Sequence, residues 1–259
     1  MKLQTMCMEC MKELGHPSFE PIIADYFDQA ISYITCGRGH RSAILIQSFK
    51  FEILLESAVE ALIHGYTLEA ASSLSAAYER TFEFAISVFA QKYSIEQQVF
   101  DLTFKQMLKQ SERQIGAFLF LYAAAFGSAY KLSDEIPRLR NKVIHQGYIP
   151  PPDEVLKFGN KIYKEIGDIT TRLREAFPKE ISDAQFAIMA ERMRSIPDGV
   201  PHATTTTNLT FCLSGKSPEP SFEQAISAYT IGKEILSSAA VPMQALFEEV
   251  QKFSPMQKR

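Results

Sequence analysis

One short segment of the sequence gathers side chains that could cleave RNA. Residues 138–145 contain Arg138, Arg140, Lys142 and His145. RNA carries its own nucleophile, the 2′-hydroxyl, so its cleavage needs no metal ion, only a proton acceptor and donor and a cation on the phosphate. Histidine exchanges protons near neutral pH, and the planar guanidinium of arginine binds two phosphoryl oxygens at once. From residue types alone, however, an exposed basic helix end is the commoner explanation.

The spacing within this segment is compatible with joint action on one phosphate. Asn141 and His145 are four residues apart and therefore share a helix face. Arg140 and His145 are five apart, about 140° around a helix, so only the long arginine side chain could bring both groups to one phosphate. The spacing alone does not separate catalysis from a basic helix surface.

A second group of residues has the types and spacing of metal ligands. Cys7 and Cys10 form a Cys-x2-Cys pair, and Cys36 and His40 form a Cys-x3-His pair. Structural zinc takes four such ligands in a tetrahedron, from two pairs that each lie on a tight turn. The glycines on either side of Arg38 permit such a turn. Because protein side chains would fill all four positions, no position would remain open for a substrate. The sequence therefore predicts one structural Zn²⁺ per chain and no catalytic metal.

The alternative to a zinc site is a set of unrelated reduced thiols beside a surface histidine. His16 is the substitute for the fourth ligand, and Cys212, far away in the sequence, is expected to be a small core residue. The N-terminus carries no apolar stretch typical of a signal peptide. We therefore expect a reducing, cytoplasmic location, where cysteines bind metals more often than they form disulfides.

The composition narrows the class of protein further. The chain has 259 residues, of which 46% are hydrophobic and 22% charged, as expected for a globular protein with a sizeable core. A formal net charge of −3 excludes a chain that coats nucleic acid by bulk positive charge, so any RNA contact needs a local basic surface. The uncharged run at residues 114–130 predicts a central helix buried on all sides, and we expect no membrane partner.

The elements that would position these residues are mainly helical. Apolar residues recur at three- and four-residue spacing over residues 48–177, which predicts an antiparallel helical bundle. Ser94 and Ser111 each precede a glutamine at capping-box spacing and are expected to begin helices. The helix that carries His145 should end at Gly147, because the prolines at residues 150–152 then force an extended turn.

The two ends of the chain show other patterns. Residues 26–35 and 41–47 alternate loosely between apolar and polar side chains, which predicts a small β-hairpin with the second ligand pair in its turn. Beyond the bundle, the expected elements are a helix over residues 182–194, a strand or ordered loop over residues 204–213, and helices over residues 219–239 and 242–253. We expect these helices to pack around the bundle or to widen a dimer interface.

The segment from Arg140 to His145, in the order Arg-Asn-Lys-Val-Ile-His, is followed by Gln-Gly-Tyr-Ile-Pro and an amphipathic helix. This string resembles the signature of HEPN domains, helical bundles whose ribonuclease members share an Arg-x4–6-His motif with asparagine commonly after the arginine. Residues 51–80 are similar to the first two helices of the family. The resemblance covers residues 46–178, about half of the chain. An N-terminal zinc ribbon also agrees with architectures around this family.

The resemblance implies a homodimer that cleaves RNA without a metal ion, leaving a 2′,3′-cyclic phosphate and a 5′-hydroxyl. Two copies of the motif would line one cleft on the two-fold axis. Many relatives act as toxins or in antiviral defence and cut tRNA or other cellular RNA, so an antitoxin or regulatory protein is a further expected partner. By the same resemblance, Arg140 would stabilise the phosphoryl charge and His145 would transfer the proton. Asn141 would orient either Arg140 or His145. The residues that would contact RNA or support the site are Lys142, Arg138 and Glu79.

We therefore expect a mainly α fold in three parts. These are a β zinc ribbon over residues 1–47, a HEPN-type bundle over residues 48–180, and a helical extension over residues 181–259 packed on the bundle. The alternative function is a non-catalytic dimeric module that binds RNA or a protein partner, since the family contains inactive members. An enzyme with catalytic zinc is disfavoured because the ligand set is closed.

Overall fold

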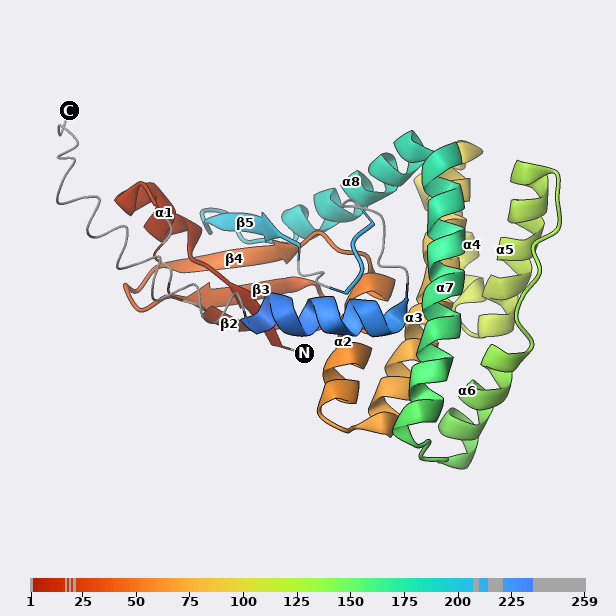
Figure 1. Cartoon of the computed structure of the whole chain (residues 1–259). Coiled ribbons are helices and arrows are strands. Elements are labelled where there is room, and N and C mark those ends of the chain that lie inside the picture. The colour runs from red at the N-terminus through yellow and green to blue at the C-terminus, as the bar shows by residue number, and fades with distance from the viewer. Residues whose placement is uncertain are drawn as a thin grey trace. The chain divides into compact units, whose positions relative to one another are not determined.

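A computed structural model of the chain describes residues 2–16, 18, 20, 22–206, 210–213 and 221–234. It confirms a mainly helical protein with a small amount of β-structure in its N-terminal part (Figure 1). The chain forms two compact units. The first holds Met1–Gln47, Met189–Thr207 and Ala228–Arg259, and the second holds Ser48–Ile188 and Asn208–Ser227, each as far as these ranges are described.

Short strands and one short helix build the first unit. β1 (Lys2–Thr5) pairs antiparallel with β2 (Ile22–Asp25), and α1 (Met8–Leu14) lies between them in the chain. β3 (Ile31–Thr35) and β4 (Arg41–Ile46) form the predicted hairpin. The parallel addition of β5 (His202–Thr205) to β4 completes a three-stranded sheet.

β4 is the central strand of this sheet, which explains its sequence. Residues 42–46 are all buried, and residues 43–46 form a continuous apolar run instead of an alternating one. Alternation is preserved in β3, where Ser32 and Ile34 are buried and Tyr33 is exposed. The register places Thr35 opposite Arg41, directly beside the turn.

Helices build the second unit, together with the described residues around Phe211 and Phe222. In chain order they are α2 (Lys50–Ile63), α3 (Thr67–Lys92), α4 (Gln97–Met107), α5 (Ser111–Phe126), α6 (Glu135–Gln146), α7 (Pro152–Ala176) and the first part of α8 (Pro178–Arg194). α2 and α3 form a hairpin whose turn uses Gly65 at a φ of +80°.

α3 is the central helix of the second unit. It contacts α2, α5, α6 and α7, which surround it in Figure 1. Most of its side chains are buried. Phe82 packs against Phe118 of α5 with ring centroids 4.9 Å apart, and both rings are fully buried. Helices from four parts of the chain therefore share one core built on α3.

α6, which carries the Arg-x4-His segment, is fixed at both ends. The backbone N–H of Ser133, just before the helix, donates to Oε1 of Glu165 on α7 at 3.1 Å, and Tyr78 of α3 donates to Oε2 at 2.9 Å. Burial raises the pKa of Glu165, although these hydrogen bonds oppose the shift. At the other end, Gly147 adopts a φ of +65° and ends the helix as predicted.

The prediction of a central helix buried on all sides over residues 114–130 is wrong. α5 ends at Phe126, and of its residues only Gln114 and Phe118 are buried, whereas Phe120 is 84% exposed. The central position belongs to α3, although α3 carries charged residues. The charged side chains of α3 are all partly or fully exposed, so its other residues can fill the core, and a central helix therefore needs no uncharged run.

The helix starts after α3 also differ in detail. α4 begins two residues later and α5 one residue earlier than the capping boxes predicted, because Glu96 and Gln110 occupy the N-cap positions. Ser94 instead has a φ of +51°, and Ser111 is the first residue of α5. Neither serine therefore occupies the N-cap position, from which its hydroxyl could accept from a backbone N–H of the first helical turn.

The predicted C-terminal extension takes part in both units. Its strand lies at His202–Thr205 and pairs with β4, because the edge of β4 needs a partner for its backbone groups. Residues 222–234 are helical, and the helix predicted over residues 242–253 lies outside the described residues. Within the described part of the chain, no helix combines the length and apolarity needed to cross a bilayer.

The packing of α7 yields a stability prediction. A Cβ atom at Gly159 would lie 2.4 Å from the ring of Phe222, whereas one at Gly167 on the same helix would meet nothing within 4 Å. Gly159→Ala should therefore destabilise the protein by about 1–3 kcal/mol through overpacking. Gly167→Ala should stabilise it by up to about 1 kcal/mol through helix propensity. Urea unfolding of both variants tests this, and equal effects would contradict the packing.

Candidate functional site

The predicted metal ligands lie together in the first unit. One ligand atom from each of Cys7, Cys10, Cys36 and His40 lies within 4.8 Å of the others. Sγ of Cys10 is 3.7 Å from Sγ of Cys36 and 3.3 Å from Nδ1 of His40, and Sγ of Cys7 is 3.7 Å from the same Nδ1. Tetrahedral bonds of about 2.0–2.3 Å place ligand atoms about 3.5–3.8 Å apart. The four residues therefore fit one tetrahedral ion.

Two local structures bring the ligand pairs together. Cys7 is the N-cap of α1 and Cys10 lies in its first turn, so their side chains share one side of the helix. Cys36 and His40 flank the β3–β4 turn, where the backbone N–H of Cys36 donates to the carbonyl of His40 at 3.1 Å. Gly39 completes this turn with a φ of +85°. Residues with a side chain rarely adopt this φ, so the turn requires the glycine that the sequence predicted there.

The thiols are buried and influence one another. Burial, followed by hydrogen bonds with Cys36 and Cys7, raises the pKa of Cys10 to about 12. Burial also raises the pKa of Cys36, but backbone hydrogen bonds from His40 and Arg38 outweigh it and lower that pKa to about 7. Without a cation, the buried thiols cannot all ionise together. A divalent metal ion would stabilise all three thiolates.

A carboxylate that the sequence analysis missed orients the histidine ligand. Oε1 of Glu13 accepts from Nε2 of His40 at 2.9 Å, and Oε2 accepts from the Arg38 guanidinium at 3.0 Å. The Arg38 guanidinium, and then His40, hold the pKa of Glu13 below its usual value. Because Nε2–H is held in this way, Nδ1 is free to face the sulfur atoms. The only signal in the sequence was a glutamate one helical turn after Cys10.

His16, the predicted substitute ligand, lies outside this centre, as does Cys212, which was predicted to be a core residue. His16 and Cys212 are not in the group of ligand atoms that lie within bonding range of one ion. Cys212 is half-buried. The Cys3His set is therefore the metal site that the described residues support.

The Arg-x4-His segment brings its predicted residues together in the second unit. Nη1 of Arg140 donates to Oδ1 of Asn141 and to Nε2 of His145, both at 3.1 Å. Nη2 of Arg140 donates to Oε1 of Glu79 on α3 at 2.9 Å. The long arginine side chain therefore spans the angle around α6 that separates it from His145, as the spacing requires.

The contact with Arg140 fixes which atom of His145 acts as an acceptor. An arginine side chain has only donors, so Nε2 of His145 is the acceptor in this hydrogen bond. The lone pair of Nε2 is therefore directed at the guanidinium. Such a nitrogen can accept a proton from a hydroxyl that replaces the arginine as its partner.

Glu79 supports Arg140 from the buried side of the site. Its side chain is 23% exposed and that of Arg140 is 24% exposed, whereas Asn141 and His145 are exposed. Arg80 lies 4.0 Å from the other oxygen of Glu79 and donates to Glu83. The guanidinium thus sits at the boundary between the core and solvent.

The two other predicted RNA contacts lie on the same helix as His145. Arg138 and Lys142 are exposed, and Nζ of Lys142 lies 5.8 Å from the centre of the Tyr148 ring. Among the described residues, no hydrogen bond or ion pair joins either side chain to the Arg140 cluster. They lie beside it on α6.

No protein family, curated protein or solved structure matches this chain. Its function is therefore inferred from the residues and their geometry.

Removal of the carboxylate behind His40 should weaken metal binding. Glu13→Gln keeps the shape of the side chain but loses the charge that holds Nε2–H, so we expect about a 10- to 100-fold lower metal affinity. Competition with a chelator, followed by elemental analysis of the protein, measures the metal affinity. Glu9→Gln is the matched control, since Glu9 lies on the same helix but pairs with Lys12. Equal affinity in both variants would contradict a role for Glu13.

Proposed function

We propose that this protein is a metal-independent RNA endonuclease of the HEPN type. The observation that carries the proposal is the position of Arg140, 3.1 Å from Nε2 of His145 and 3.1 Å from Asn141, with Glu79 behind it. A proton-transfer group, a phosphate-binding cation and a polar orienting group therefore meet at one exposed point. The resemblance of residues 46–178 to HEPN domains agrees with this site.

In the proposed reaction, the guanidinium of Arg140 turns from His145 to two oxygens of an RNA phosphate. Nε2 of His145 then accepts the proton of the adjacent 2′-hydroxyl. The 2′-oxygen bonds to phosphorus as the bond to the 5′-oxygen breaks, which leaves a 2′,3′-cyclic phosphate. The 5′-oxygen takes a proton and leaves as a hydroxyl, for which the second copy of the motif in a homodimer supplies the acid. Arg140 stabilises the charge that develops on the phosphoryl oxygens.

We assign the Cys3His centre to a structural Zn²⁺. Its three sulfur atoms and one nitrogen are donors that zinc prefers, and the protein fills all four positions. The ion would add no catalytic step and would hold α1 against the β3–β4 turn. Protein purified without added metal should contain one zinc per chain.

The HEPN resemblance also supports a biological setting for the proposal. We place the protein among cytoplasmic effectors of toxin–antitoxin or antiviral systems that cut tRNA or other cellular RNA. An antitoxin or regulatory protein would then restrain it. These assignments rest on the resemblance.

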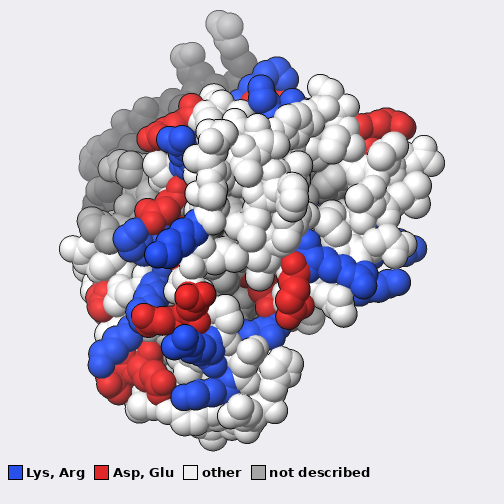
Figure 2. All heavy atoms as spheres, turned by 90° about the vertical axis from the view of Figure 1, so that its right-hand side faces the viewer, with Lys and Arg blue, Asp and Glu red and all other residues white. Residues whose placement is uncertain are grey.

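A surface on α5 suits the proposed homodimer. Figure 2 shows a broad uncharged surface over α5, with charged side chains gathered below it over α6. Gly116, Phe120, Ala123 and Ala124 follow one stripe of α5 and are all exposed. A bulky ring between small residues can insert into the same surface of a second copy, as a two-fold interface requires. The same surface would serve a protein partner in the alternative, non-catalytic module.

The catalytic proposal predicts RNA cleavage in the presence of EDTA. Wild-type protein should cleave single-stranded RNA, and His145→Ala should lower the rate at least about 100-fold because the proton acceptor is lost. His64→Ala is the control, since His64 is an exposed histidine at the end of α2 whose partner among the described residues is Glu60 on the same helix. Gel analysis of labelled RNA provides the measurement. Full activity of His145→Ala would refute the assignment, and absence of cleavage by the folded wild type would favour the binding module.

The dimer proposal predicts a change in mass. Wild-type protein should have twice the chain mass of 29.2 kDa, and Phe120→Glu should be a monomer, because a buried charge opposes the interface. Phe186→Glu changes another exposed ring, on α8, and should leave the dimer intact. Light scattering coupled to size exclusion distinguishes these states. A monomeric wild type would contradict the proposed interface.

A further inference from the structure

The exposed side of α6 continues from His145 toward the start of the helix. Arg138, Asn141, Lys142 and His145 are spaced i, i+3, i+4 and i+7, so they form one stripe, and all four are exposed. Residues 138 and 145 are about 10.5 Å apart along the helix axis at 1.5 Å per residue. The histidine therefore lies at one end of a line of cationic and polar side chains.

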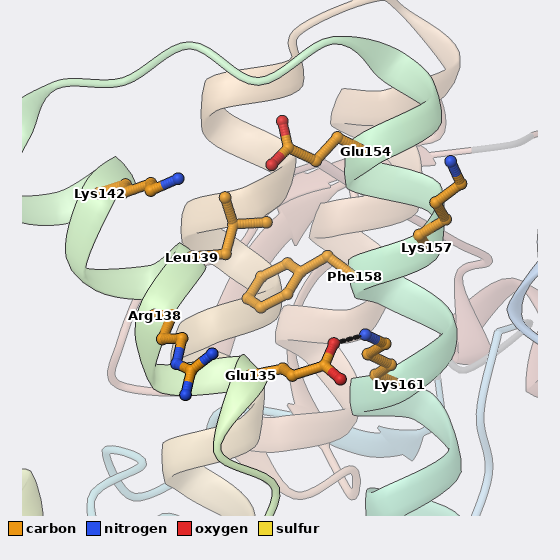
Figure 3. A pocket seen from close by; sticks show the side chains of 8 residues that line it. All are labelled: Glu135, Arg138, Leu139, Lys142, Glu154, Lys157, Phe158 and Lys161. Atoms are coloured by element: carbon orange, nitrogen blue, oxygen red, sulfur yellow. Dashed lines mark ion pairs between the residues drawn. The ribbon is translucent and has the colours of Figure 1, made fainter.

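This stripe borders a groove between α6 and α7. The groove encloses ≈370 Å³, and its cationic walls are Arg138 and Lys142 from α6 and Lys157 and Lys161 from α7 (Figure 3). Leu139 and Phe158 point into it between the two helices. The groove thus has charged walls and an apolar floor.

Two carboxylates also line the groove, and both already have partners. Glu135 forms an ion pair with Lys161, and Glu154 accepts a hydrogen bond from the Tyr148 hydroxyl at 2.7 Å. Four lining cations against two lining carboxylates leave a positive surplus, which Asp153, 3.6 Å from Lys157, reduces but does not cancel, although the whole chain has a net charge of −3. Among the described residues, Arg138 and Lys142 have no carboxylate partner within ion-pair distance. The groove is therefore a local basic surface of the kind that RNA contact requires in an acidic protein.

We propose that the groove holds the phosphate backbone of single-stranded RNA next to the cleaved bond, an inference that rests on the proposed ribonuclease function. Phosphates would lie against Arg138, Lys142 and Lys157, and the strand would run along α6 to His145. At about 3.4 Å per nucleotide of a stacked strand, the stripe spans roughly three nucleotides. A single strand is the required form, because attack by the 2′-oxygen needs it in line with the bond that breaks, which a regular A-form helix does not allow.

The groove fits a nucleic acid strand better than an acidic peptide. Its cations stand on both sides of the groove, on α6 and on α7, where they can follow a row of backbone phosphates. Its apolar floor offers no donor for the backbone of a peptide. Its position on the helix of His145 gives the strand a direct route to the reacting groups.

Binding in a protein that cannot cleave tests the groove separately from catalysis. The full-length His145→Ala protein is titrated against a fluorescein-labelled 12-nucleotide single-stranded RNA of mixed sequence, and anisotropy gives the dissociation constant at several salt concentrations. In this background, Lys157→Gln should weaken binding about threefold, and Arg138→Gln with Lys157→Gln about tenfold. The slope of log affinity against log salt should fall by about 0.7 for each phosphate that the variant no longer neutralises.

A matched lysine provides the control. Lys179 at the start of α8 pairs with Asp183 four residues away, as Lys157 pairs with Asp153, and both lysines are mostly exposed. Lys179 follows the far end of α7, about 22 Å of helix beyond Lys161. Lys179→Gln should change the affinity less than twofold.

The outcomes separate this inference from the proposed function. Equal binding by the double variant and Lys179→Gln, or no binding of the RNA at all, would overturn the groove as the binding surface. Groove-dependent binding, with no cleavage by the wild type in EDTA, would support the groove and refute the ribonuclease. Cleavage with groove-independent binding would overturn the groove alone.

Discussion

The ion pair between Arg140 and Glu79 is the interaction on which the candidate RNA site depends. Glu79 lies on α3, the most buried helix of the second unit, so its carboxylate has a fixed position. α6 has only 12 residues and would not be stable alone. The packing of Ile136 and Val143, together with this ion pair, holds α6 on the core. The exposed side of α6 can then present His145 in one orientation.

The metal centre has the same role in the first unit. Its strands are four to six residues long and supply little apolar surface of their own. Cys7, Cys10, Cys36 and His40 join α1 to the β3–β4 turn, and Glu13 fixes the direction of the histidine. A bound ion would therefore contribute directly to folding. In each unit, a carboxylate that takes no part in the chemistry positions a side chain that does. Glu13 positions the metal ligand His40, and Glu79 positions Arg140.

Local patterns in the sequence predicted the features that depend on neighbours in the chain. The Cys-x2-Cys and Cys-x3-His pairs, the β3–β4 hairpin and the end of α6 at Gly147 are of this kind. Pairings across the chain were not predictable in this way, as β5 shows, because a four-residue strand gives no signal for a parallel partner about 160 residues away. The absence of charge in residues 114–130 predicts burial of α5, yet Phe120 is exposed. Glu13, Lys157 and Lys161 matter only through contacts that folding creates, whereas Lys142 was predicted from its place in the motif.

The 2′-hydroxyl as nucleophile is the central claim, and one substitution in the RNA tests it most directly. After the cleaved bond is mapped in EDTA, a substrate with a single 2′-deoxynucleotide on the 5′ side of that bond is compared with the all-RNA strand. Loss of cleavage at that bond, with a 2′,3′-cyclic phosphate on the product of the all-RNA strand, is the predicted result. Cleavage of the deoxy-substituted bond at the original rate would contradict the account, because another nucleophile would then attack the phosphate.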